Sequence, residues 1–532
     1  MSGLGRASLV IGAGTIASRL SGLLRTIVLV GAIGAVGRAT DAFTVANTLP
    51  NTIFAIISTG ILTAVIVPQI VKVSADPDGG HAFISKLFTL GTVVLLLTAA
   101  VATAAAPLLV RLYAPDFTDA QLALATAFAY WCMPQIFFYG LYALMGETLN
   151  ARRVFGPFTW APIVNNAVSI AGFLVFIALF GGPRFQLAGW TPDMVAVLGG
   201  TATLGIVLQA GILGIFWRRA GLRLRPDFRW RGVGLRHIGR LAGWTFLMVI
   251  AGQVAGLIQS RAVSAASGDF PAQTVMANAW LIFMLPYSVI VLSIGTPYFT
   301  RLSEHAVAGR HDDVRRDIES SIRTLGFFIV IAAAALAVAA VPASRIFTNN
   351  PADAVAAARV LLCYLVALLP LAVLFVIQRT FYAYNDTRTP FFFTLLQCAL
   401  VIAGALIATA VLPAEYLAAG VALGQSLASI VQVIVATWLL HRRRGGIGVA
   451  SWSAALARFV VAAIPAAAAG WLVYVLLGGA DGWILSDKLP GAIGAALIGS
   501  TCIVVYVGVL AAFRAPEIAV AQQILRRFLP KK

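Results

Sequence analysis

Long apolar segments follow one another along almost the whole chain. A helix that crosses a bilayer needs about 20 mostly apolar residues. By that criterion the 532 residues contain about 14 segments of sufficient length, separated by short polar connections. The chain is therefore predicted to be an all-α integral membrane protein with about 14 transmembrane helices.

Composition supports the same class and excludes others. Hydrophobic residues make up 60% of the chain and charged residues only 11%, whereas an ordinary soluble chain is about 25% charged. The formal net charge of +18 would suit a nucleic-acid binder only if the charge covered a water-soluble face. Here the basic residues cluster in short gaps between apolar runs, so no nucleic-acid partner is expected.

The predicted spans follow from apolar length and helical periodicity. In chain order they are Ala7–Gly34, Thr40–Val71, Phe83–Ala106, Ala120–Gly146, Phe158–Phe180, Asp193–Trp217, Ile238–Val263, Ala272–Leu302, Ile318–Val341, Ala354–Ala383, Pro390–Val411, Glu415–Leu440, Ala454–Leu477 and Lys488–Phe513. Ala515–Leu529 combines apolar residues with Arg526 and Arg527, which is typical of a helix along the membrane surface.

The basic residues predict the orientation of the chain. With a cytoplasmic N-terminus, the even-numbered connections hold most of the arginine and lysine, and cytoplasmic loops of membrane proteins are enriched in these residues. Examples are Lys72, Arg152, Arg153, the run Arg218–Arg240, Arg310, Arg388 and Arg442–Arg444. Both termini are therefore expected in the cytoplasm. Orientation is favoured over lipid headgroup binding as the role of these loops.

The prolines indicate an internal repeat. Pro50 and Pro286 each follow a leucine in a predicted helix and lie 236 positions apart, and the same offset relates Pro134 to Pro370. Because each repeat holds an even number of helices, both share one orientation. The predicted organisation is two parallel six-helix lobes, 1–220 and 221–445, followed by two additional helices and a basic tail in 446–532. Matched prolines inside helices are interpreted as bending points.

Two arginines in the first predicted span are the leading candidates for substrate binding. Charge within a membrane span is costly and tends to face a bundle interior or a water-filled cavity. Arg19 and Arg25 lie six residues apart, about 120° around a helix, with Ser18, Ser21 and Gly22 beside them. Arginine stays charged and binds phosphate with two parallel hydrogen bonds, so the pair suggests an anionic substrate that carries phosphate.

Polar residues in the second predicted span complete the candidate site. Asp41 follows a glycine-rich turn and is interpreted either as the N-cap of its helix or as a gate. Asn47 and Asn51 flank Pro50 and share one helix face; they either line the cavity or repair the break at the proline. Asn165 and Asn166 are interpreted as interhelical contacts.

Catalytic chemistry finds little support in the sequence. No HExxH, P-loop or Gly-x-Ser-x-Gly context appears, and no predicted span contains an acidic pair. The four cysteines lie inside apolar runs without CxxC spacing, so they are expected to be small core residues. A transporter is predicted rather than an enzyme, with no metal site.

The first two predicted spans contain the motifs SR-x5-R, ATDAF, LPN and VP, and the segments LNARRVFGPFTWAPIVNN and FYAYNDTRTP follow further on. Together these motifs resemble the MurJ/MviN family of lipid II flippases, within the multidrug/oligosaccharidyl-lipid/polysaccharide exporter superfamily. The resemblance implies a central cationic cavity and two extra helices that form a groove for the lipid tail. It also implies that Arg19, Arg25 and Asp41 act in substrate binding or gating, and that an undecaprenyl-diphosphate-linked precursor is moved from the inner to the outer leaflet of the bacterial cytoplasmic membrane.

The sequence departs from the family pattern at a few positions. Thr26, Phe54, Ala55 and Leu281 stand where the resemblance implies charged residues, so a less cationic cavity is expected. No cofactor is expected; the membrane potential or a monovalent cation would drive the cycle. Expected partners are the lipid-linked substrate, membrane lipids and cell-wall synthesis proteins.

Three alternatives stay open. A related exporter would carry another lipid-linked oligosaccharide, a polysaccharide or a drug, although a drug/cation antiporter should place Asp or Glu inside its lobes. A membrane polyprenyl-phosphate glycosyltransferase would need a carboxylate cluster near one interface. A scaffold in a cell-wall complex would not need the buried charges.

Overall fold

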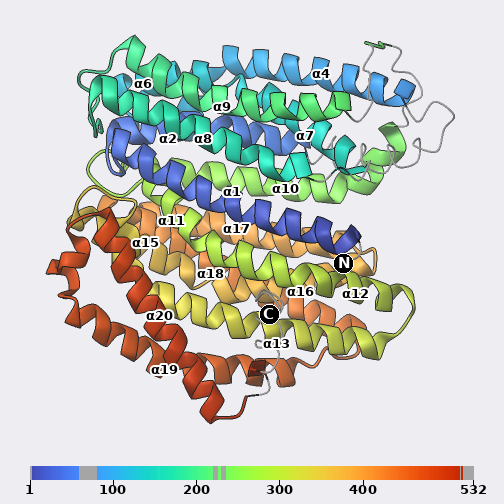
Figure 1. Cartoon of the computed structure of the whole chain (residues 1–532). Helices are drawn as coiled ribbons and strands as arrows, with labels where there is room; N and C mark the ends of the chain where they lie inside the picture. The colour runs from blue at the N-terminus through green and yellow to red at the C-terminus, as the bar shows by residue number, and fades with distance from the viewer. Residues whose placement is uncertain are drawn as a thin grey trace. The chain divides into compact units, whose positions relative to one another are not determined.

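The computed structural model describes residues 3–58, 81–151, 154, 156–219, 226–228, 235–515 and 517–518. Regular structure within these ranges is helical throughout, which confirms the all-α class (Figure 1). Several predicted features lie outside the described residues: the second span beyond Ser58, Lys72, Arg152 and Arg153, most of the basic linker Arg218–Arg240, and nearly all of the surface helix Ala515–Leu529.

Twelve helical segments in the described part are long and apolar enough to cross a membrane. Each of them overlaps one predicted span, from Ile84–Ala104 to Lys488–Ala512. The two remaining predictions, Ala7–Gly34 and Thr40–Val71, are not among the twelve, and the structure describes the second only as far as Ser58. The total of 14 therefore stays a prediction.

The chain divides into two compact units, and unit 1 covers residues 1–274. Its described helices are α1 (Gly3–Ile33), α2 (Arg38–Ile57), α4 (His81–Ala104), α5 (Ala106–Tyr113), α6 (Asp119–Cys132), α7 (Gln135–Ala151), α8 (Gly156–Phe180), α9 (Pro192–Arg219) and α10 (Leu235–Ser264). Since α10 packs on α2 and α5, it groups with the helices that precede it. The predicted domain limits at 220 and 445 rest on the repeat and stay a prediction.

Aromatic residues organise the interior of unit 1. The Phe43 and Phe128 rings meet edge to face at 5.2 Å, and Phe128 meets Trp190 at 5.3 Å, which joins α2 to α6 and to the loop before α9. A second cluster forms where Phe88 of α4 packs on Trp217 of α9 at 4.6 Å. These contacts join α2 to α6 and α4 to α9 within unit 1.

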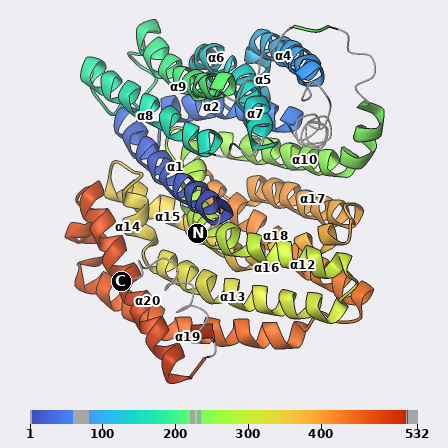
Figure 2. The same ribbon diagram turned by 45° about the vertical axis from the view of Figure 1, so that its right-hand side comes forward.

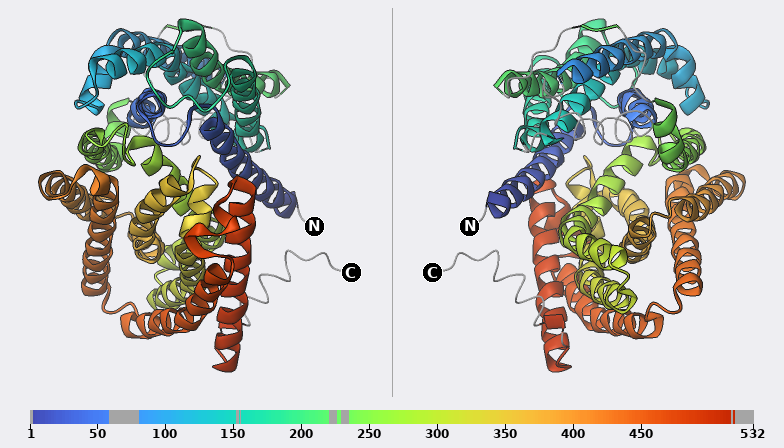
Figure 3. Two further views of the ribbon diagram at one scale, coloured as in Figure 1. Left: turned by 90° about the vertical axis from the view of Figure 1, so that its left-hand side faces the viewer. Right: turned by 90° about the vertical axis from the view of Figure 1, so that its right-hand side faces the viewer.

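Unit 2 covers residues 275–532 and contains the rest of α11. Its elements are α11 (Gln273–Pro286), the π-helix η2 (Tyr287–Leu292), α12 (Ser293–Val307), α13 (His311–Val338), α14 (Ala340–Arg345), α15 (Pro351–Leu365), α16 (Leu368–Ala383), α17 (Arg388–Val411), α18 (Leu417–Arg444), α19 (Val449–Leu476) and α20 (Lys488–Ala512). The last two helices, α19 and α20, pack on each other and on α13. They are the orange-red and red ribbons of Figure 3, and α13 is yellow-green.

Helix lengths in the two units agree with the predicted repeat. The short helices α5 and α14 have 8 and 6 residues. The pairs that follow have 14 and 15 residues (α6, α15), 17 and 16 (α7, α16), 25 and 24 (α8, α17), and 28 and 28 (α9, α18). Capping repeats as well, because Thr118 accepts a hydrogen bond from a first-turn N–H of α6 and Asn350 does so for α15.

The four matched prolines have different local effects. Helix α2 continues through Pro50, whereas Pro134 lies in the break between α6 and α7. Pro286 ends α11, where the π-helix begins, and Pro370 lies in the first turn of α16, just after the break at Val366–Ala367. Since a proline removes one helical hydrogen bond, interruption near it is expected. The use of these points as hinges stays a prediction.

Helix α13 begins earlier than the sequence predicted. The predicted span starts at Ile318, but the helix starts at His311 with Asp312 and Asp313 in its first turn. Acidic side chains are favourable there because they face the positive end of the helix dipole. Because of the earlier start, Asp313 and Asp317 both belong to α13, whereas the predicted span Ile318–Val341 contained neither.

Candidate functional site

Helix α1, which carries Arg19 and Arg25, is attached to α8 along much of its length (Figure 2). Asn166 Nδ2 donates hydrogen bonds to the Ser18 carbonyl oxygen at 3.2 Å and to Ser21 Oγ at 2.9 Å. A Cβ at Gly22 would lie 3.6 Å from the same nitrogen, at van der Waals contact, so the amide also lies beside Gly22. This confirms the interhelical role predicted for Asn166.

The two arginines have different surroundings. The Arg19 side chain is exposed, whereas Arg25 is half-buried and interacts electrostatically with Tyr139 of α7. The Tyr139 ring stacks on Phe54 at 5.8 Å, so a position where the resemblance implied charge holds an aromatic ring. Neither arginine forms an ion pair with a side chain in the part of the chain that the structure describes.

Asn47 and Asn51 share a helix but not an environment. Asn47 Oδ1 accepts hydrogen bonds from Gln135 Nε2 at 3.4 Å and from Cys132 Sγ at 3.8 Å, which ties α2 to the break between α6 and α7. Gln135 Nε2 also donates to Thr203 Oγ1 at 2.9 Å. Asn51 is exposed. Asn47 is thus a packing contact within unit 1, and Asn51 is the asparagine whose side chain is open to a ligand.

Asp41 does not cap its own helix, so the N-cap interpretation is wrong. Helix α2 starts at Arg38 with Gly37 as its N-cap, which places Asp41 in the first turn. The buried carboxylate instead accepts hydrogen bonds from Thr274 N at 2.9 Å, Thr274 Oγ1 at 3.0 Å and Ser267 Oγ at 2.7 Å. Thr274 is the second residue of α11, so Asp41 caps a different helix from its own. The negative charge of Asp41 stabilises the N-terminal end of α11, where the helix dipole is positive.

The residues around Asp41 form a polar cluster that sequence reasoning missed. Gln121 Nε2 donates to Ser267 Oγ at 2.8 Å and to the Arg38 carbonyl at 3.0 Å. Gly268 has a φ of +112°, and a Cβ there would lie 2.7 Å from the Arg38 side chain. The run SGDFPAQT from 267 to 274 covers part of the connection before the predicted span Ala272–Leu302 and the start of that span, and nothing in the sequence connects it to Asp41.

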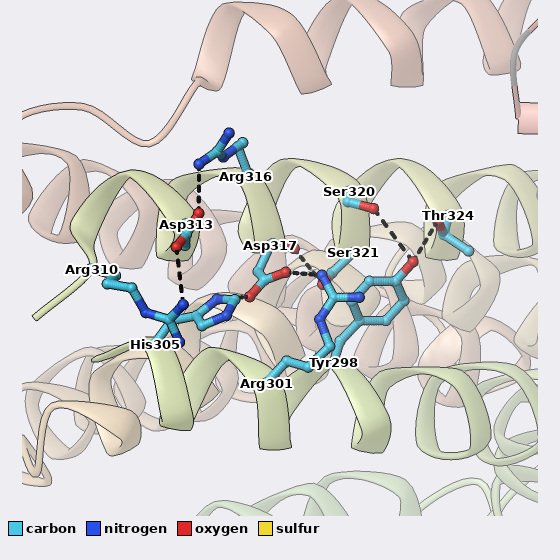
Figure 4. A network of polar contacts seen from close by, with 10 residues as sticks. All are labelled: Tyr298, Arg301, His305, Arg310, Asp313, Arg316, Asp317, Ser320, Ser321 and Thr324. Carbon is cyan, nitrogen blue, oxygen red and sulfur yellow. Dashed lines mark hydrogen bonds and ion pairs between the residues drawn. The ribbon is translucent and has the colours of Figure 1, made fainter. Parts of the chain in front are cut away.

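A second polar cluster lies in unit 2 between α12 and α13 (Figure 4). The buried Asp317 carboxylate forms an ion pair with Arg301, and its other oxygen lies 2.7 Å from His305 Nδ1 without the alignment of a hydrogen bond. Tyr298 shares contacts with Ser320 and Thr324 at 3.4 and 3.3 Å. The cluster joins two successive helices. Its positive charge is neutralised by Asp317, so it leaves no unpaired charge for a ligand.

No set of three or more His, Cys, Asp or Glu side chains comes together within the described ranges. The cysteines Cys132, Cys398 and Cys502 are buried and Cys363 is half-buried, and all four are unpaired.

Comparison with known proteins decides the family. A family model described as lipid II flippase MurJ matches residues 30–486. The chain belongs to the MurJ family. The match includes Asp41, Asn47 and Asn51 and begins after Arg19 and Arg25.

The matches to curated relatives in the MurJ family extend over most of this chain and most of each relative. A probable lipid II flippase MurJ of Haemophilus influenzae is 27% identical over 479 residues, which is 85% of this chain and 88% of the relative. One of Rhizobium meliloti is 28% identical over 408 residues, which is 74% of each chain.

Solved structures show the same fold. A structure of lipid II flippase MurJ in an inward closed conformation has a TM-score of 0.72 at 19% identity and covers 95% of this chain and 98% of that one. An inward-facing MATE-family multidrug transporter has a TM-score of 0.65 at 15% identity, covering 83% and 98%.

Membership of the MurJ family confirms the prediction of a multi-pass transporter of the bacterial inner membrane. The family is one of lipid flippases, so the transporter class, rather than a catalytic enzyme, is also confirmed. The likeness to the MATE-family transporter, at 15% identity, is one of fold.

Proposed function

We propose that this protein moves lipid II from the inner to the outer leaflet of the bacterial cytoplasmic membrane by alternating access. The observation that carries the proposal is the family match over residues 30–486, together with two arginines on α1 that have no acidic partner among the described residues. Lipid II carries a diphosphate, and arginine pairs with phosphate through two parallel hydrogen bonds. The chemistry of the helix therefore suits the substrate that the family name implies.

The two arginines would take different parts in binding. Arg19 is exposed and would meet the diphosphate first, whereas Arg25 is half-buried and would hold it. The exposed amide of Asn51 would add a hydrogen bond to the sugar or peptide part. Asn47 would act through Gln135 by fixing the bend between α6 and α7.

Asp41 would act as a gate element through the helix it caps. Its carboxylate fixes the start of α11 by three hydrogen bonds from Ser267 and Thr274. A change in the direction of α11 would have to break or carry along these bonds. A gate needs two discrete states, and here they would be the cluster with these hydrogen bonds made and the cluster with them broken.

Coupling and orientation complete the proposal. The membrane potential or a monovalent cation would drive the cycle, and both termini would lie in the cytoplasm, as the distribution of basic residues predicts. Cell-wall synthesis proteins, which consume the flipped precursor, would be the protein partners.

The leaflet distribution of lipid II after depletion tests the function. In cells depleted of this protein, we expect lipid II to accumulate in the inner leaflet and to become inaccessible to a probe added outside spheroplasts. Restored expression should return it to the outer leaflet. Unchanged access to lipid II, with a defect in export of another polysaccharide, would replace this proposal with the related exporter.

A further inference from the structure

Glu517 of unit 2 lies between two arginines that come from different helices. Arg323 of α13 donates to Glu517 Oε1 from Nε at 3.0 Å and from Nη2 at 2.7 Å. Arg458 of α19 donates from Nη2 to Oε1 at 3.0 Å and to Oε2 at 2.9 Å. The carboxylate side chain is 7% exposed, whereas Arg323 and Arg458 are 32% and 39% exposed.

The charges of this group do not balance. Two guanidinium groups carry two positive charges, and one carboxylate neutralises only one of them. Arg458 Nε is buried and has no hydrogen-bond partner, so one donor of the pair is left unused by Glu517. A buried donor without a partner is costly, and a phosphate group, with more acceptor oxygens than a carboxylate, would satisfy it.

The arginines belong to a firm frame. Phe327 of α13 packs on Phe459 of α19 at 5.9 Å and on Tyr506 of α20 at 5.6 Å. The Tyr506 hydroxyl donates to the Phe327 carbonyl at 3.1 Å. The three helices therefore hold the arginine pair in place without help from Glu517.

Glu517 itself reaches the pair from outside this frame. Helix α20 ends at Ala512, and the chain then turns through Arg514, whose φ of +50° is uncommon for a residue with a side chain.

We propose that Arg323 and Arg458 form a binding site for a phosphate group, and that Glu517 occupies it as an internal ligand. The carboxylate stands where a phosphate would bind, on the same two guanidinium groups. A phosphate must displace it, so the apparent affinity of the site is reduced by the fraction of molecules in which Glu517 is bound. The site is separate from the arginines of α1 and does not depend on the transport function proposed above.

Binding of dioctanoyl phosphatidic acid to the purified full chain in detergent tests the site. We expect Glu517→Gln to bind this lipid about tenfold more tightly than the unchanged protein, because the charged competitor is gone. Adding Arg323→Gln or Arg458→Gln to that variant should abolish the gain. Glu415→Gln removes the partner of Arg359 at an exposed ion pair and is the matched control, with no expected gain.

Two further measurements identify the source of the phosphate. If inorganic phosphate competes with phosphatidic acid at equal concentration, the site takes free phosphate. If the lipid stays bound in a large excess of inorganic phosphate, the site takes a lipid headgroup. Dioctanoyl phosphatidylcholine, which has no net charge, should bind less well than phosphatidic acid in either case.

Thermal unfolding distinguishes a binding site from a permanent structural tie. If Glu517→Gln does not fold, Glu517→Asp keeps the charge on a shorter side chain and should show a smaller gain in the same direction. A loss of thermal stability in both variants without any gain in phosphatidic acid binding would overturn the proposal.

Discussion

The two units of this protein handle charge in different ways. All nine ion pairs between side chains that the structure describes lie in unit 2, where Asp317, Asp386, Glu415 and Glu517 each face an arginine. In unit 1 the buried carboxylate of Asp41 meets neutral partners instead, since it accepts hydrogen bonds from Ser267 and Thr274.

This difference indicates where a charged ligand can bind. An arginine that faces one carboxylate is already neutralised, as Arg359 is by Glu415, whereas Arg19 and Arg25 have no acidic partner in the described part of the chain. The two arginines that share Glu517 are an exception in unit 2. Because charge in a membrane span is expensive unless it is used, the unpaired arginines of unit 1 are the stronger candidates for substrate. Unit 2 resembles unit 1 in helix lengths but differs from it in how its charged side chains are paired.

Replacing an arginine of α1 should produce the largest effect. Arg25→Ala or Arg19→Ala removes charge-assisted hydrogen bonds to the diphosphate, and we expect transport to fall by about a hundredfold. The measurement is the amount of lipid II accessible at the outer leaflet in a strain that depends on the variant. Arg25→Lys keeps the charge but loses the planar fork, so partial activity is expected.

The matched control comes from unit 2. Arg359→Ala removes an arginine whose exposed partner is Glu415, and transport should stay near its original level. If both replacements reduced transport equally, with normal insertion of each variant, the contrast between the units would be wrong.

Asp41→Ala should produce the next largest effect, on stability. It leaves Thr274 N and two hydroxyl groups without their shared acceptor, and we expect a loss of about 2–3 kcal/mol in the free energy of unfolding. Thermal unfolding in detergent measures this. Asp41→Asn retains one acceptor oxygen and should lose less, and a variant as stable as the original would show that the cluster does not hold α11.

A smaller effect is expected at Gly268 and allows a comparison with Gly309 in unit 2. Both have positive φ, at +112° and +71°, but only Gly268 has a close neighbour, since its added Cβ would lie 2.7 Å from Arg38. Gly268→Ala should cost about 1–3 kcal/mol, and Gly309→Ala less, at about 1–2 kcal/mol. Equal shifts in unfolding temperature would mean that the side chain of Arg38 moves aside freely.

The exposed ion pair between Arg359 and Glu415 should contribute least. Both side chains are 43% exposed, and exposed pairs contribute about 0–1 kcal/mol because water and salt screen them. Glu415→Gln should therefore leave the unfolding temperature almost unchanged. A large decrease would place this pair among the structural ties of unit 2.

The fold was predictable from sequence to a large extent, because apolar length and proline spacing are local or periodic properties. The twelve membrane-length segments from Ile84–Ala104 to Lys488–Ala512 each overlap a predicted span, and the helix lengths in the two units repeat. The short helices α5 and α14 were not predicted. The partners of Asp41 were not predictable, since Ser267 and Thr274 are more than 220 positions away and short polar residues are common in turns. The early start of α13 was missed because charged turns at helix ends look like loops when apolar length alone is counted.

The hydrogen bonds from Asn166 to Ser18 and Ser21 limit how α1 can move. A helix fastened on one side cannot roll about its own axis without giving up those bonds, so Arg19 and Arg25 keep their directions within the unit. Any turnover that presents these charges first to one leaflet and then to the other must therefore carry α1 and α8 together as one piece.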